Sequence, residues 1–280
     1  MTRRLSCLSV LLFCLSYQSV AQEVLYTDED LEVSYMYPAV LGTGTYLIKG
    51  NRLTMLKVPF SWHDNADESK RTRWRGLLPV VAGYNELQSI DSDIIDVLFP
   101  NNLVTFTFLP GAEYLFQAGP GWQLKPFMQI GASRDFSTNE TIYMAHAGVR
   151  SLNLYTPDEK LELRWGNALR WAAEYQVNSG DRLRMSVFET GIDLRYELPV
   201  KVLNRRSDIG AYYIYQYLLP KWINTDRLDD PDAKLLHEVG VSFGLKTPYQ
   251  VFGMDLDRLR LGYKTGGSFQ GWTLGAGFPF

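Results

Sequence analysis

The chain has 280 residues, of which 46% are apolar and 14% aromatic. Its mean hydropathy is nevertheless −0.16, and no long uncharged apolar run remains after Ala21, which excludes a helical membrane protein. Lysine and arginine number 28 against 31 aspartates and glutamates, so the chain lacks the basic excess that nucleic-acid binding usually needs.

The first 21 residues predict a secretory signal peptide. Arg3 and Arg4 precede the apolar stretch 8–15, and Ser19-Val20-Ala21 places small residues three and one positions before a cut ahead of Gln22. The apolar stretch is well short of the roughly 20 residues that a membrane-spanning helix needs. We therefore expect residues 1–21 to be removed on export and residues 22–280 to form one domain.

Both cysteines, Cys7 and Cys14, lie in the predicted signal peptide. The mature chain would therefore have no disulfide and no cysteine-based metal site. An exported protein of this size without disulfides needs another source of stability. A closed β-barrel in lipid supplies it, because every backbone group is paired and the bilayer offers no competing water.

The main signal along the mature chain is alternation with a period of two. Between residues 161 and 175, for example, Leu163, Trp165 and Leu169 share one face while Arg164 and Arg170 lie on the other. This is the period of a β-strand and not that of an amphipathic helix. The stretch is longer than the roughly 5–6 residues of an ordinary globular strand, whereas a tilted membrane strand needs about 9–11.

The alternation predicts an all-β fold, a transmembrane antiparallel β-barrel of about 12 strands. The expected strands are 36–48, 51–60, 71–84, 103–117, 121–131, 140–150, 160–175, 182–198, 207–219, 235–246, 256–264 and 269–280. Pro79, Pro110 and Pro126 fall inside these ranges, so each must lie at a bulge unless its strand is misassigned. A soluble β-sandwich is the alternative, but strands of this length with charges of both signs on the polar face favour the barrel.

The connections between the strands also fit a barrel. With both ends of the chain in the periplasm, the odd-numbered connections face outward. Three of them, 85–102, 132–139 and 220–234, are then surface loops, while the short turn Ala118-Gly119-Pro120 lies on the periplasmic side. Long connections outside and short ones inside are the asymmetry that outer-membrane barrels show.

The last twelve residues predict the strand that closes the barrel, with Trp272, Leu274, Phe278 and Phe280 on one face. A terminal aromatic preceded by alternating apolar residues resembles the recognition signal of barrels inserted by the outer-membrane assembly machinery. We therefore expect Trp272, Phe278 and Phe280 to form an assembly signal. Phe280 should sit partly exposed at the periplasmic end of the strand.

In size and strand number the chain resembles the autotransporter-type β-domain, and more narrowly the solitary autotransporter-like barrels that lack a passenger. The resemblance covers the chain from about Gln22 onward. It implies a barrel in the outer membrane whose partners are outer-membrane lipid, the barrel assembly machinery and periplasmic chaperones. It brings no catalytic motif and no cofactor.

No residue pattern identifies an enzyme. Outer-membrane phospholipases and lipid A deacylases share a His-x-Ser pair that supplies base and nucleophile. Neither His146 nor His237 has a serine at that spacing, and His63 lies beside Asp64 in a predicted periplasmic turn. We therefore expect no enzymatic activity, no cofactor and no metal.

The polar faces of the strands supply the candidate site, which is the lumen of the barrel. Its expected lining residues carry charges of both signs: Glu162, Arg164, Arg170, Glu174, Asp193, Arg195, Glu197, Arg258 and Arg260. These side chains could line an aqueous channel, or opposite charges on neighbouring strands could pair and fill a narrow interior. Unpaired buried ions would cost several kcal/mol each, so the mixture of signs favours pairing.

We therefore expect a protein of a Gram-negative outer membrane with a structural or surface-interaction role, whose loops 85–102 and 220–234 contact something outside the cell. The alternative is a small channel or porin-like transporter with a charged lumen. About twelve strands give an interior between the filled eight-stranded barrels and the open sixteen-stranded porins. The extracellular ligand is unknown.

The mature protein should begin at or near Gln22, because the small residues Ser19 and Ala21 mark the expected cleavage site. N-terminal sequencing of protein extracted from membranes checks this. A sequence that starts at Met1 would contradict it.

Overall fold

The computed structural model describes residues 35–36, 41–48, 51–63, 72–86, 104–202, 204–219, 235–251, 254–267 and 269–280. The chain divides into two compact units, Met1–Leu31 and Glu32–Phe280. The first unit, and with it the predicted signal peptide, lies outside the described residues. No helix in the described ranges is long and apolar enough to cross a membrane.

Within the part of the chain that the structure describes, all regular structure is β. Its thirteen strands are β1 (Thr43–Ile48), β2 (Asn51–His63), β3 (Thr72–Glu86), β4 (Val104–Phe108), β5 (Gly111–Gly119), β6 (Trp122–Asp135), β7 (Thr141–Tyr155), β8 (Leu161–Gln176), β9 (Arg182–Val202), β10 (Arg205–Leu218), β11 (Leu235–Val251), β12 (Met254–Gly266) and β13 (Phe269–Ala276). β4 and β5 both lie between β3 and β6, and only Leu109 and Pro110 separate them. Counted as one span, they give the twelve strands that the sequence predicts.

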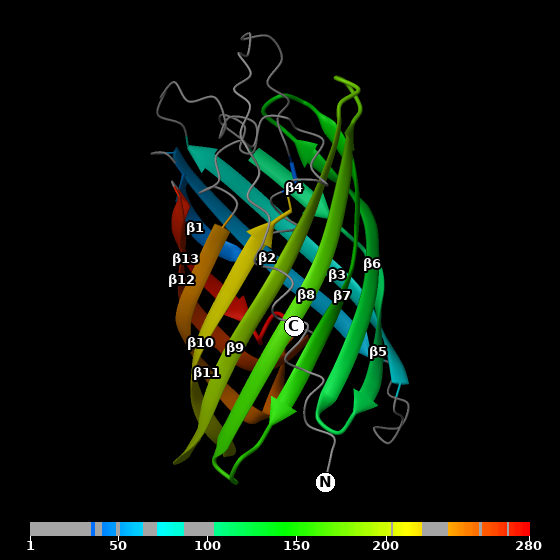
Figure 1. The fold of residues 1–280 in the computed structure, drawn as a ribbon. Coiled ribbons are helices and arrows are strands. Elements are labelled where there is room, and N and C mark those ends of the chain that lie inside the picture. Colours follow the sequence, from blue (N-terminus) through cyan, green and yellow to red (C-terminus); the bar gives the residue numbers. More distant parts are fainter. Residues whose placement is uncertain are drawn as a thin grey trace, which may run out of the picture. The chain divides into compact units, whose positions relative to one another are not determined.

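The sheet closes on itself (Figure 1). Consecutive spans pair antiparallel around the ring, and β1 pairs with β13, with Thr43 opposite Leu274 and Ile48 opposite Phe269. Closure removes the free edges that an open sheet would expose. The prediction of an all-β, antiparallel, closed barrel is confirmed.

The two faces of the barrel are inverted relative to those of a soluble protein. Leu169 and Ile192 point outward and are 50% and 49% exposed, whereas Glu113 and Asp193 point inward and are 0% and 1% exposed. An apolar exterior around a charged interior is the arrangement of a barrel that faces lipid.

The two ends of the barrel differ in their connections. One end, the loop end, carries the connections after β1, β3, β6, β8, β10 and β12, which include residues 87–103 and 219–234. The other end, the turn end, carries the connections after β2, β5, β7, β9 and β11, which include the pairs 120–121 and 252–253. The two longest connections thus lie at the same end, as the sequence predicts, although the turn end also carries the longer connection 64–71.

The proline positions differ in part from the expectation. Pro79 lies directly opposite Pro59, and Pro126 lies opposite Val149, with no shift of register at either place. The expected bulges at Pro79 and Pro126 are therefore absent from these described strands. Two opposed residues without N–H groups can occupy a non-hydrogen-bonded antiparallel pair at no cost to that pair. Of the three prolines Pro79, Pro110 and Pro126, only Pro110 separates two described strands, β4 and β5.

Charge on the outer face should be tolerated according to depth. In lipid vesicles, Ile192→Arg should lower the free energy of unfolding by about 2–4 kcal/mol, because Ile192 lies in the interior of the outward apolar row of β9, which runs from Phe188 to Val202. Val202→Arg, at the turn-end edge of that row, should cost no more than about 1 kcal/mol. Urea titrations of the two variants measure the difference, and equal losses would show that this row does not cross the bilayer.

Candidate functional site: the lumen of the barrel

The nine charged residues predicted for the lumen lie at inward positions of three strands. Glu162, Arg164, Arg170 and Glu174 are on β8, Asp193, Arg195 and Glu197 are on β9, and Arg258 and Arg260 are on β12. All are buried or half-buried. The structure therefore brings together residues that are up to about a hundred positions apart in the chain. Whether they line a path for ions remains a prediction.

Near the turn end these charges form ion pairs. Arg164 Nε lies 2.6 Å from Glu162 Oε1, and Arg195 Nη1 lies 3.4 Å from the same oxygen. Arg195 Nε lies 2.7 Å from Asp193 Oδ2. The four side chains alternate in sign across the β8–β9 pair, so pairing neutralises them.

A second group of charges is centred on Glu238 of β11, which is 2% exposed. Lys264 Nζ lies 3.2 Å from its Oε2, and Arg260 Nη1 lies 3.4 Å from its Oε1. The hydroxyls of Tyr212 and Thr273 each donate to Oε1 at 2.9 Å. Two cations and two hydroxyls thus compensate the loss of water around this carboxylate, as a buried ion requires.

The list of nine predicted lumen residues omits five buried carboxylates that have partners in the lumen: Glu113, Asp135, Glu189, Asp208 and Glu238. Glu113 and Glu189 are 0% and 1% exposed. Glu113 ion-pairs with Arg75 and, at 2.7 Å, with Arg150, while Glu189 pairs with Arg170 at 2.5 Å. Each of the five occupies an inward position of the same alternation, so the sequence could have predicted that its side chain faces the lumen. For those that form ion pairs, the sequence could not have predicted the partner, because that partner lies on another strand.

Tyr35, Met36 and Leu41, the described apolar residues before β1, lie inside the barrel, and none of them extends that strand. The prediction that the first strand begins at residue 36 is wrong, since β1 begins at Thr43. The Tyr35 N–H donates to Glu174 Oε2 at 2.9 Å, and its hydroxyl donates to Asp135 Oδ2 at 3.0 Å. Burial raises the pKa of the Tyr35 phenol, which keeps the hydroxyl protonated as the donor. Met36 is also buried.

A buried apolar cluster surrounds this segment. Its members come from the segment before β1 and from the strands around it: Tyr35, Met36, Leu41, Tyr46, Leu53, Met55, Val81, Leu109, Ile142, Met144, Ala172, Leu183, Met185, Val187, Leu218, Leu236 and Phe269. Apolar side chains from so many strands can share one cluster only across the interior. This region of the lumen is therefore packed like a protein core.

The end of the chain also lies inside the barrel. The prediction that the last strand runs to residue 280 is wrong, because β13 ends at Ala276. Gly277 has a φ of +69°, a conformation that favours glycine, and its N–H donates to the Arg258 carbonyl at 3.0 Å. Pro279 has no N–H to continue a ladder. The C-terminus accordingly lies within the ring of strands in Figure 1.

Phe280 is held on the far side of the lumen. It is 5% exposed, so the expectation of a partly exposed terminal side chain is also wrong. A Cβ on Gly166 of β8 would lie 2.2 Å from the ring, and one on Gly191 of β9 would lie 2.9 Å from it. Lys125 of β6 donates to the Phe280 carbonyl oxygen at 3.1 Å. The tail Gly277–Phe280 therefore crosses from β13 to the opposite strands.

Of the three residues predicted as an assembly signal, only Trp272 faces outward, with 60% exposure. Phe278 is half-buried and its ring lies 4.9 Å from that of Phe280. Recognition of the three residues by the assembly machinery stays a prediction, since it concerns the chain before it folds.

The inward face of β8 shows how these parts are stacked. From the turn end it presents the charged Glu162 and Arg164, then Gly166 and Ala168 beside Phe280, and then Arg170. Next come Ala172 in the apolar cluster and Glu174, which binds Tyr35. Charged and apolar layers thus alternate along the lumen.

The histidines with described side chains show no catalytic grouping. His146 is buried and its Nδ1 lies 3.1 Å from Gln129 Oε1, while Nδ1 of His237 lies 2.7 Å from the Tyr213 hydroxyl. The side chain of His63 lies outside the described residues. Within the described ranges, no group of three or more His, Cys, Asp or Glu residues could hold a metal ion.

Comparison with known proteins agrees with this architecture. The chain is similar in structure to the β-domain of the Bordetella autotransporter BrkA, with a TM-score of 0.50 and 10% sequence identity over 84% of this chain and 96% of that one. The expected resemblance to autotransporter-type β-domains is thus confirmed for the fold. No family model matches the chain. No curated protein matches it in sequence.

The contact between Phe280 and Gly166 should be detectable as an energetic coupling. Phe280→Ala should lower the free energy of unfolding by about 3 kcal/mol, because it removes a buried ring. Gly166→Ala should also destabilise, because its Cβ meets that ring. In the Phe280→Ala background, however, Gly166→Ala should cost little. Urea titration of the wild type, the two single variants and the double variant in lipid gives the coupling energy. If the two losses of unfolding free energy simply add, the Phe280 ring does not contact Gly166.

Proposed function

We propose that this protein is an integral barrel of a Gram-negative outer membrane, exported with cleavage before Gln22, with a closed lumen and a structural or surface-interaction role. One observation carries the proposal: Tyr35, Met36 and Leu41, which precede β1, and the tail after β13 lie inside the barrel. An open channel would need that space.

The outer surface supports placement in a membrane. Its exposed apolar side chains are flanked at the turn end by Trp62, Trp74 and Trp122, which are 56%, 62% and 42% exposed, and near the loop end by Tyr143 and Tyr175. Aromatic side chains with a polar tip favour the two boundaries between lipid and water. The loop end then faces outward, and connections 87–103 and 219–234 are the parts available to an external partner.

The lumen supports a non-conducting and non-enzymatic role. The Phe280 ring blocks one level, and the apolar cluster around Tyr35 fills another. Between them, the charges are paired with one another. An apolar level without polar partners offers a dehydrated ion nothing to bind, so it opposes conduction.

The alternative function, a small channel or porin-like transporter, draws on the charged layers at Glu162 and at Glu238. It would require the tail Gly277–Phe280 and the segment around Tyr35 to leave the lumen together. The hydrogen bonds from Tyr35 to Glu174 and Asp135 and from Lys125 to Phe280 oppose that movement.

Conductance in a planar bilayer tests the proposal. Purified protein, shown to be inserted by its resistance to alkaline extraction of the same vesicles, should give no stable single-channel steps. A sixteen-stranded porin reconstituted in parallel shows that the preparation can report a channel. Reproducible steps from the inserted protein would overturn the closed lumen and favour the transporter.

A further inference from the structure

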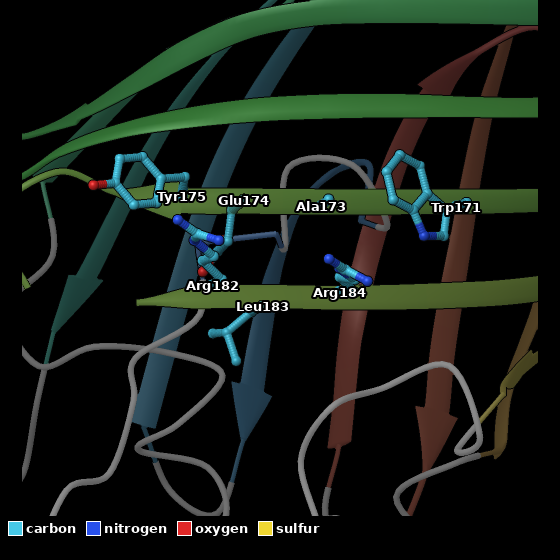
Figure 2. A pocket seen from close by; sticks show the side chains of 7 residues that line it. All are labelled: Trp171, Ala173, Glu174, Tyr175, Arg182, Leu183 and Arg184. Atoms are coloured by element: carbon cyan, nitrogen blue, oxygen red, sulfur yellow. The ribbon is translucent and has the colours of Figure 1, made fainter. Parts of the chain in front are cut away.

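Two arginines and two aromatic residues border a shallow hollow on the outer face of the barrel (Figure 2). Trp171, Ala173, Glu174 and Tyr175 come from β8, and Arg182, Leu183 and Arg184 come from β9. The side chains of Glu174 and Leu183 are buried on the lumen side, where Glu174 accepts a hydrogen bond from the Tyr35 N–H. Tyr175 stands opposite Arg182 and Ala173 stands opposite Arg184 in the β8–β9 pair. The small side chain of Ala173 between two large rings leaves a space of about 370 Å³.

The arginines of the hollow differ from those of the lumen in having no acidic partner. Arg182 and Arg184 are exposed, and neither forms an ion pair with any residue that the structure describes. Arg182 lies with its Cζ 5.5 Å from the centre of the Tyr175 ring, which holds one guanidinium in place. On the described strands β6–β9, the carboxylates all occupy inward positions: Asp135, Glu162, Glu174, Glu189, Asp193 and Glu197. The outer face here is therefore cationic.

The position of the hollow along β9 matches the level of lipid headgroups. The outward, mainly apolar row of this strand runs from Val202 and Val200 at the turn end through Tyr196 and Ile192, and it ends toward the loop end at Phe188. Ser186 follows, and then Arg184 and Arg182. Arginine facing lipid is costly at mid-depth and tolerated at the interface. Both arginines are thus at the loop-end interface.

We propose that this hollow binds the phosphate of an anionic lipid in the outer leaflet. The two guanidinium groups donate hydrogen bonds to the phosphate oxygens, for which their forked geometry is suited. The acyl chains of the same lipid lie along Leu169 and Phe188. These two outward residues stand opposite each other on the turn-end side of the hollow and are 50% and 37% exposed. The inference rests on the proposed membrane location and goes beyond it, because it gives the barrel a lipid-specific site.

The test compares two double variants that each remove two positive charges from exposed hairpin positions. Arg182→Gln/Arg184→Gln alters the hollow. Lys201→Gln/Arg206→Gln is the matched control, since these two residues stand opposite each other on β9 and β10 and are exposed at the turn end. Each protein is incubated in dodecyl maltoside micelles with bisphosphorylated lipid A, with the same lipid after removal of both phosphates, or with inorganic phosphate. Native mass spectrometry then counts the retained lipid.

The wild type and the control should retain the bisphosphorylated lipid at about tenfold lower concentration than the Arg182→Gln/Arg184→Gln protein, because two charge-assisted contacts are lost there. The dephosphorylated lipid should not distinguish the three proteins, and inorganic phosphate should not displace the lipid. The site would be overturned if both double variants retained the bisphosphorylated lipid equally. It would also be overturned if added inorganic phosphate abolished the difference in lipid retention between the wild type and the Arg182→Gln/Arg184→Gln protein. Alkaline extraction of the wild type from membranes would instead contradict the membrane location, so the two failures are distinguishable.

Discussion

The pairing of β1 with β13 is the contact on which the rest of the structure depends. Once Thr43 lies opposite Leu274, the sheet has no edge, and the side chains of every strand alternate between an enclosed interior and the outside. The outside is mainly apolar, so most charged residues of the strands share one interior. Their charges must then be neutralised within that interior, because each buried ion without a partner would be costly. The ion pairs of Glu113, Glu189 and Glu238 follow from this closure.

The period of two predicted the twelve spans and the inward face of residues such as Arg164 and Asp193, because a strand records its two faces directly in sequence order. It did not predict where the first and last strands stop. Residues 36–42 and 277–280 continue the apolar pattern, but the described side chains of Met36, Leu41 and Phe280 pack into the lumen instead of facing outward. Alternation in the sequence cannot distinguish an apolar side chain that faces outward from one that packs inside the lumen, since both surroundings are apolar. The partner of each buried charge was also beyond prediction, because it depends on which residues closure sets opposite one another, as with Glu113 and Arg150.

The internal position of Phe280 is compatible with recognition of the same residue during assembly. Lys125, Gly166 and Gly191 belong to β6, β8 and β9, so the site for the terminal ring exists only when these strands have come together. Before that, the unfolded chain has no lumen, and Trp272, Phe278 and Phe280 can be presented as an extended strand to a sheet edge. Phe280 can thus be recognised during assembly, before the barrel closes, and can afterwards pack inside the lumen of the folded barrel. A stability defect in Phe280→Ala therefore does not argue against a role in assembly.

Two groups of arginines on the described strands follow the same electrostatic argument. Inside, Arg170, Arg195 and Arg258 each have a carboxylate supplied by the protein. On the outer face of β9, Arg182 and Arg184 have none, although alternation could have placed an acidic residue beside them at little structural cost. An exposed cation in water needs no partner, but one at the margin of a lipid layer is only partly hydrated, and its neighbours there are headgroups. Phosphates of those headgroups are the anions that this position offers. The absence of a protein carboxylate on the outer face of the described strands β6–β9 leaves both guanidinium groups open to them.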